Sequence, residues 1–205
     1  NIIDKLYFLY FLNMLIKHMK KVHIIDYGYN NIGSIVNMLI HIGVQPHVIS
    51  SPCGIDNIDY LVLPGIGSFD RGIRELERLN FIEFLNEYKL RERPLMGICL
   101  GMQLMTKSSE EGKLKGLGWF DAETIEFKFD VNVKLMIPHM GWNNLNILKN
   151  NPLFSDVEKL HRFYFVHSYY VKCNSKEDIL STTEYGRRFV SAIQKNNIFG
   201  VQYHP

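Results

Sequence analysis

Cys99 stands between Gly97 and Gly101, directly after the apolar run 95–98 and before a helix-like stretch at 100–107. This order predicts a strand, a sharp turn and a helix, with the thiol at the corner. Glycines suit such a corner because it is crowded and a Cβ would clash there. The positive end of a helix dipole favours a thiolate, so we expect a nucleophile. The alternative is a buried structural cysteine, which is the commonest environment of a free thiol.

The spacing also matches the nucleophile elbow, Gly-x-Ser-x-Gly, with cysteine in the serine position. The backbone N–H of Leu100 would then face an oxyanion beside the sulfur. The loop 64–67 can supply a second donor, because glycines on both sides of Ile66 let a backbone N–H turn toward a substrate. We disfavour a phosphate cradle there, since the third glycine of a dinucleotide fingerprint and the Gly-Lys-Ser/Thr of a P-loop are absent.

A nucleophilic thiol needs a base, and the chain has eight histidines. Five of them lie in stretches without other polar signals, and we expect these at the surface or the core edge: His18, His23, His41, His47 and His161. Denser motifs contain His139, His167 and His204. His204 follows the strand-like run 200–203, where a sheet presents residues at its edge, so we assign it as the base. A Cys–His pair assembled from distant segments is the usual layout for thiol catalysis.

Strands and helices alternate through the first half of the chain. Strands are expected at 22–26, 44–49, 59–63 and 95–98, and helices at 32–42, 70–79, 81–89 and 100–107. This rhythm predicts an α/β fold with a doubly wound, mostly parallel, flavodoxin-like sheet and sites at the carboxyl ends of its strands. Short strands are then expected at 124–127, 133–137, 162–166, 179–183, 189–195 and 198–203. They predict an antiparallel extension, with a two-residue turn at Asn196-Asn197.

Composition narrows the function classes. The net charge is +2 and the basic residues are scattered, which argues against nucleic-acid binding. The three cysteines are far apart and no CxxC pair occurs, so we expect no disulfide framework and no metal site, in a cytoplasmic protein. The apolar run 6–16 is too short to span a membrane. Because Met19 directly precedes the first strand, we expect 1–18 to be an upstream extension and 19–205 one domain; an extra packing helix is the alternative.

Several motifs together resemble a known family. The elbow 97–103, the loop 64–67 and the terminal segment 200–205 are similar to class I (triad-type) glutamine amidotransferases. Three further segments, at 26–31, 137–143 and 164–169, resemble the glutaminase subunit of imidazole glycerol phosphate synthase, an enzyme of histidine biosynthesis. The resemblance covers residues 20–205 in the same order, and the segment 138–143 is its most specific part.

The resemblance implies a mechanism and its residues. Cys99 would attack the side-chain amide of glutamine and form a glutamyl thioester, with His204 moving the protons. Leu100 N–H and a flipped peptide at Gly65-Ile66 would hold the oxyanion. The positions that match glutamine-binding residues are Gln103, Glu111, His167, Ser168 and Tyr169. No cofactor and no metal are implied.

The resemblance also implies a heterodimer with a barrel-shaped cyclase/synthase subunit, which receives the ammonia through a channel. The residues expected at that interface are Asn31, Met140, Trp142 and Asn143. In the family a Glu that orients the histidine, and a final helix, follow the His-Pro pair, whereas this sequence ends at Pro205. We therefore expect a C-terminally truncated chain with impaired activity.

Three other functions stay open at this point. The first is the glutaminase of another class I amidotransferase, such as the one serving pyridoxal phosphate synthesis. The second is a cysteine hydrolase or thiol sensor on a flavodoxin-like sheet. The third is a catalytically inactive binding subunit.

Overall fold

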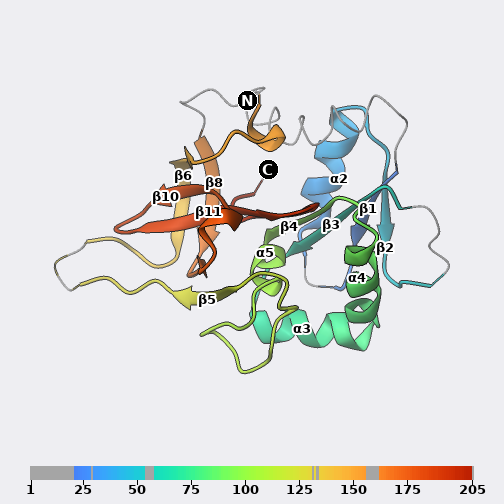
Figure 1. Ribbon diagram of the computed structural model, residues 1–205, viewed down its shortest axis with the longest axis horizontal. Coiled ribbons are helices and arrows are strands. Elements are labelled where there is room, and N and C mark those ends of the chain that lie inside the picture. The colour runs from blue at the N-terminus through green and yellow to red at the C-terminus, as the bar shows by residue number, and fades with distance from the viewer. Residues whose placement is uncertain are drawn as a thin grey trace.

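The computed structural model describes residues 21–28, 30–53, 58–130, 132, 134–155 and 162–204, so the predicted extension 1–18 lies outside the described residues. Its centre is a parallel sheet with the strand order β2-β1-β3-β4-β12 (Figure 1). The first four of these strands are β1 (Val22–Ile25), β2 (Pro46–Ile49), β3 (Tyr60–Gly65) and β4 (Leu95–Cys99). The strands β1, β3 and β4 are buried along their whole length, as expected for a sheet covered on both faces.

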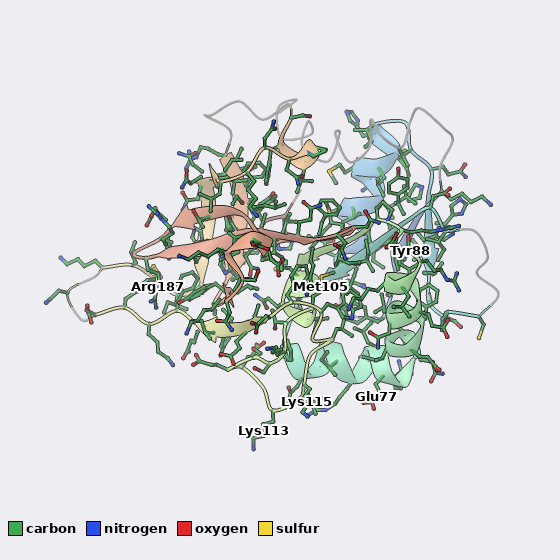
Figure 2. All side chains as sticks on the ribbon, in the orientation of Figure 1. Glu77, Tyr88, Met105, Lys113, Lys115 and Arg187 are labelled. Atoms are coloured by element: carbon green, nitrogen blue, oxygen red, sulfur yellow. The ribbon has the colours of Figure 1, made fainter. Side chains whose placement is uncertain are left out.

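Helices cover both faces of this sheet. They are α2 (Ile32–His41), α3 (Phe69–Arg78), α4 (Phe81–Leu90) and α5 (Leu100–Leu104). Helix α2 packs on one face through Ile35 and Leu39, and the other three helices pack on the opposite face. Side chains such as Tyr88 and Met105 are buried in the interior, whereas Arg187 is exposed (Figure 2). The doubly wound architecture expected from the βα rhythm is confirmed.

The second half of the sheet is antiparallel. Strand β12 (Ile198–Val201) lies parallel to β4 and antiparallel to β11 (Arg188–Lys195), which continues to β10 (Ile179–Glu184) and β7 (Asn146–Ile147). The predicted turn is confirmed, because Lys195 pairs with Ile198 and Asn196 has a φ of 54°. Strand β9 (Tyr169–Cys173) pairs with β11 and with β5 (Ala122–Glu126).

A separate two-stranded ribbon corrects the sequence prediction. It consists of β6 (His139–Asn144) and β8 (Arg162–His167), paired antiparallel. The strand predicted at 133–137 is wrong, because residues 134–137 belong to no strand, and β6, for which no strand was predicted, follows them instead. Apolar residues at 135–137 suggested a strand, yet Met136 is 80% exposed. Glycine and asparagine have low strand propensity, so β6 is held by its pairing with β8 rather than by its own composition.

The helix after the elbow is shorter than expected. It ends at Leu104 rather than at residue 107. The hydroxyl of Thr106 donates to the Gln103 carbonyl, 2.7 Å away, and so satisfies a carbonyl that a longer helix would have bonded. Within the described ranges, no helix has both the length and the apolar character that a membrane span needs.

Candidate functional site

The elbow is formed by Cys99, at the end of β4 and directly before α5. Its backbone has a φ of 54° and a ψ of −111°, a positive-φ region that non-glycine residues rarely occupy outside functional sites. A Cβ at Gly101 would overlap the Leu63 carbonyl, and one at Gly97 would lie 2.8 Å from the Gly101 backbone. The sequence prediction of a strained, crowded corner is confirmed.

The protonation state of Cys99 differs from the sequence expectation. Burial raises the pKa of the thiol to about 12, although the Leu100 N–H and the Gln202 side-chain amide act in the opposite direction. Helix α5 has only five residues, and its N-terminus does not offset the desolvation of a sulfur that is 7% exposed. The resting group is therefore a neutral thiol, and it must lose its proton to a base when substrate is attacked.

His204 is held beside this pocket by its backbone. It follows β12, and its N–H donates to the Tyr164 carbonyl of β8 at 2.9 Å. Its Nε2 is buried and finds no hydrogen-bond partner within the described ranges. Burial lowers the pKa of the imidazole, so the ring is neutral near pH 7 and can accept a proton.

One pocket of about 380 Å³ brings the predicted groups together. Cys99 lines it from the end of β4, and His204 from the segment that follows β12. The residues predicted to bind glutamine line it as well, as do two of the three predicted oxyanion residues: Gln103, Glu111, His167, Ser168, Tyr169, Ile66 and Leu100. The convergence of segments separated by more than a hundred positions is what a parallel sheet achieves at the carboxyl ends of β3, β4 and β12.

Two buried glutamine side chains connect this pocket's walls. The Gln103 amide nitrogen lies 3.0 Å from the Tyr169 carbonyl and 3.0 Å from Gln202 Oε1. The amide of Gln202 in turn donates to Cys99 Sγ at 3.6 Å. Gln202 is fully buried, and the sequence analysis did not select it. The signal was a polar residue in an otherwise apolar strand, because a buried amide needs a defined set of partners.

A histidine relay fixes the turn that carries Ser168. His167 Nδ1 lies 2.8 Å from the Tyr169 carbonyl, which can only accept, so this nitrogen carries the proton and Nε2 is an acceptor. His139 Nδ1, 3.2 Å from that Nε2, must then be a donor. His139 Nε2 accepts from the Asn143 amide at 3.4 Å. Both rings are neutral, because burial lowers the pKa of His167 to about 3 and that of His139 to about 4.

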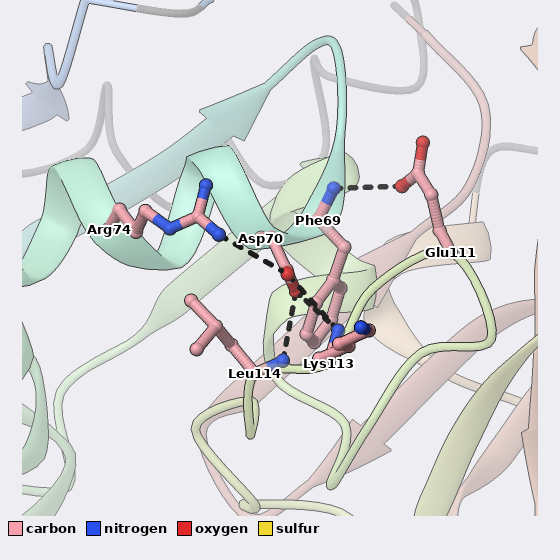
Figure 3. A network of polar contacts seen from close by, with 6 residues as sticks. All are labelled: Phe69, Asp70, Arg74, Glu111, Lys113 and Leu114. Atoms are coloured by element: carbon pink, nitrogen blue, oxygen red, sulfur yellow. Dashed lines mark hydrogen bonds and ion pairs between the residues drawn. The ribbon is translucent and has the colours of Figure 1, made fainter.

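Glu111 is an exposed residue of the pocket lining, in a loop that contacts the start of α3. Its Oε2 accepts the Phe69 N–H at 2.8 Å, and its other oxygen points away from this bond (Figure 3). Beside it, Asp70 accepts from the backbone N–H groups of Lys113 and Leu114. Burial raises the pKa of the Glu111 carboxyl, and the nearby Asp70 acts in the same direction. Glu111 thus contributes a carboxylate to the pocket lining, and a carboxylate is the type of group that binds a cation.

Comparisons with known proteins agree with this geometry. A model of the family described as "Glutamine amidotransferase class-I" matches residues 23–205. The imidazole glycerol phosphate synthase subunit HisH 2 of Methanococcus maripaludis is 51% identical over 183 residues, or 89% of this chain and 90% of that protein. HisH 1 of Campylobacter jejuni is 42% identical over 184 residues, again 89% and 90% of the two chains. The chain belongs to the class-I glutamine amidotransferase family, in its HisH group.

Solved structures show the same fold at low sequence identity. PurLQS from Thermotoga maritima has a TM-score of 0.66 at 18% identity, covering 90% of this chain and 87% of that one. A glutamine amidotransferase of the same organism has a TM-score of 0.63 at 18% identity, covering 91% and 76%. The resemblance inferred from the motifs, and the fold class, are thus both confirmed.

The residues predicted at a partner interface lie in two places. Met140 and Trp142 on β6 are 61% and 46% exposed. Asn31 lines a second pocket of about 500 Å³, which shares Ile66, Val166 and His204 with the first and also contains Gly65 and Tyr164. Asn143 has an internal role in addition, because its amide donates to the Glu184 carbonyl at 2.9 Å. The interface assignment itself stays a prediction.

Proposed function

We propose that this chain hydrolyses glutamine to glutamate and ammonia through a thioester on Cys99, as the glutaminase subunit of imidazole glycerol phosphate synthase. The single observation that carries the proposal is the pocket lined by both the strained Cys99 and His204, whose buried Nε2 has no hydrogen-bond partner among the described residues. The five predicted substrate residues line the same pocket. The relatives are named as subunits of imidazole glycerol phosphate synthase, which supports a second subunit, and the motif resemblance supports histidine biosynthesis as the pathway.

The first half of the reaction starts from a neutral pair. His204 Nε2 takes the thiol proton as the sulfur of Cys99 attacks the side-chain carbonyl carbon of glutamine. The oxygen becomes an oxyanion, which the N–H groups of Leu100 and Ile66 stabilise; one such donor contributes about 10²–10³ in rate. The imidazolium then gives its proton to the departing nitrogen. Ammonia leaves, and a γ-glutamyl thioester remains on the sulfur.

The second half uses the same groups. The imidazole of His204, neutral again, takes a proton from a water molecule that attacks the thioester carbonyl. A second oxyanion forms at the same two N–H donors, and its collapse releases the thiolate of Cys99, which regains the proton. Glutamate leaves, and the enzyme returns to its resting state. Because burial disfavours a free thiolate here, proton transfer and attack are coupled in this mechanism.

The pocket's polar groups suit the two ends of glutamine. The free carboxylate oxygen of Glu111 matches the α-ammonium group. Ser168 and Tyr169 line the same pocket, and their hydroxyl and backbone donors match the α-carboxylate. The turn that carries them is held by two donors on the Tyr169 carbonyl, from His167 and Gln103. A fixed turn lowers the entropy cost of binding a small, flexible amino acid.

The second subunit is proposed to be a barrel-shaped cyclase that receives the ammonia. Exposed Met140 and Trp142 are of the types that interfaces favour. They stand on β6, and Trp142 packs edge-on against Tyr164, a wall residue of the second pocket. Because that pocket shares His204 with the first, it offers ammonia a direction of exit away from the substrate's entry.

The test is ammonia production from glutamine by the chain in complex with its cyclase subunit. Cys99→Ala should abolish it, because the nucleophile is lost. Cys53→Ala is the matched control: it removes an exposed thiol and should leave the rate unchanged. Ammonia production that persists at the wild-type rate in Cys99→Ala would contradict the proposal.

A further inference from the structure

Tyr27 carries a buried hydroxyl that the mechanism above does not use. The side chain follows β1 and is 0% exposed. Its oxygen has no hydrogen-bond partner within the part of the chain that the structure describes. An unpaired buried hydroxyl is unfavourable, and native proteins retain very few of them. We therefore expect this hydroxyl to form a hydrogen bond in another conformation of the protein.

The hydroxyl lies against the backbone of the oxyanion loop. A Cβ at Gly65 would overlap the Tyr27 oxygen, and would also lie 2.8 Å from the Leu100 Cβ and 3.0 Å from the Gly101 nitrogen. Only glycine at position 65 lets the phenol approach this closely. The strand order β1-β3-β4 explains the contact, because Gly65 pairs with Cys99 in the register of β3 and β4 while β1 flanks β3 on the other side.

The peptide beside this hydroxyl can rotate. Gly65 is buried at the end of β3, whereas Ile66 is 44% exposed and Gly67 has a φ of 89°. Glycines on both sides of Ile66 accept backbone angles that other residues resist. Rotating the Gly65–Ile66 peptide exchanges the positions of the Gly65 carbonyl and the Ile66 N–H. When the N–H faces the oxyanion, the carbonyl turns to the opposite side and needs a donor.

We propose that Tyr27 is a positioning residue for the oxyanion hole: its hydroxyl donates to the Gly65 carbonyl when the Gly65–Ile66 peptide aims its N–H at the developing oxyanion. This inference rests on the proposed glutaminase mechanism and adds a residue to it. Both unpaired groups are satisfied in that arrangement, which stabilises the catalytic backbone conformation relative to the resting one.

The electrostatics of the site keep the hydroxyl a donor. Burial raises the pKa of the Tyr27 phenol, and the charge of a Cys99 thiolate would raise it further. The group therefore keeps its proton throughout the pH range in which the reaction can be assayed. It can donate, but it cannot compete with His204 for the proton of the thiol.

Tyr27→Phe tests this role, because it removes one oxygen and keeps the ring. In glutamine hydrolysis by the chain in complex with its cyclase subunit, kcat should fall about tenfold, the effect of one hydrogen bond made only in the transition state. KM for glutamine should be unchanged, since Tyr27 does not line the substrate pocket. The melting temperature should be unchanged or higher, because the hydroxyl has no hydrogen-bond partner among the residues that the structure describes.

Tyr88→Phe is the matched control. The Tyr88 ring is equally buried, but its hydroxyl already donates to the Pro94 carbonyl at 3.2 Å, far from the elbow. This variant should lower the melting temperature and leave kcat unchanged. A wild-type kcat in Tyr27→Phe, or a lower melting temperature with equal losses in kcat and in glutamine binding, would overturn the inference. The proposed function is judged separately, by whether Cys99→Ala abolishes the wild-type activity.

Discussion

The neutral histidine pair makes the stability of the fold depend on pH in a specific window. Burial lowers the pKa of His139 to about 4 and that of His167 to about 3, against about 6.5 in an unfolded chain. Below pH 6.5 the unfolded chain binds protons that the folded chain excludes. Stability is therefore complete above about pH 6.5 and falls as the pH drops toward the folded-state values.

The size of this effect follows from the two shifts. Each histidine contributes up to about 1.4 kcal/mol per pH unit within the window, so lowering the pH from 8 to 5 should remove about 2 kcal/mol for each and about 4 kcal/mol for both. That is a large share of the 5–15 kcal/mol that typically holds a domain together. Carboxylates add little above pH 5, because most of them protonate at lower pH.

The assay is urea unfolding at pH 8 and at pH 5. His139→Gln keeps a neutral group at this position, so the free energy of unfolding that is lost between pH 8 and pH 5 should be smaller by about 2 kcal/mol. His41→Gln alters an exposed histidine at the end of α2 and should retain the wild-type loss. If the urea midpoint of the wild-type protein is the same at the two pH values, the assignment of His139 and His167 as a neutral, buried pair is refuted.

Three further results are expected. Gly101→Ala should destabilise the fold by about 3 kcal/mol in urea unfolding, because the added Cβ would overlap the Leu63 carbonyl. Gly33→Ala is the control: position 33 has open space around it, so this variant should be neutral or stabilising. Equal stability of the two variants would contradict a crowded elbow. Iodoacetamide at pH 7 should label the exposed Cys53 well before Cys99, and the masses of the two peptides would measure this. Equal labelling rates would contradict a neutral, buried thiol at Cys99. Gln202→Leu should cost about 1–3 kcal/mol in the same unfolding assay and lower kcat, because the thiol loses its donor and the Gln103 amide loses one of its two acceptors. An unchanged kcat would show that the Gln202 amide does not position the sulfur.

The sequence predicted those parts of the fold that local pattern determines. Apolar runs identified β1, β3 and β4, and the elbow spacing around Cys99 identified the nucleophile. Strand β6 could not be predicted from its own sequence. The segment from His139 to Asn144 is a strand because it pairs with β8, which is distant in the sequence. Local propensity carries no information about such pairing.

The residues of the site could be predicted from the sequence, but their protonation states could not. Residue types and motifs selected the pocket lining, but burial is a property of the folded chain. Desolvation keeps Cys99 a thiol, whereas a helix N-terminus alone would have favoured a thiolate. Gln202 was missed for a related reason: its role depends on the buried Gln103 and the sulfur, which only the fold brings within reach. Asn143 was predicted only as an interface residue. Its internal hydrogen bonds depend on β6 being a strand, which the sequence did not indicate.

The central claim is that Cys99 forms a covalent bond to the γ-carbonyl of glutamine within the pocket that also contains His204. The most direct measurement mixes the chain, in complex with its cyclase subunit, with glutamine, quenches with acid within one turnover and weighs the peptides. We expect a mass gain of one γ-glutamyl group on the peptide that contains Cys99. An unmodified Cys99 peptide throughout active turnover, or the adduct on Cys173 instead, would contradict it.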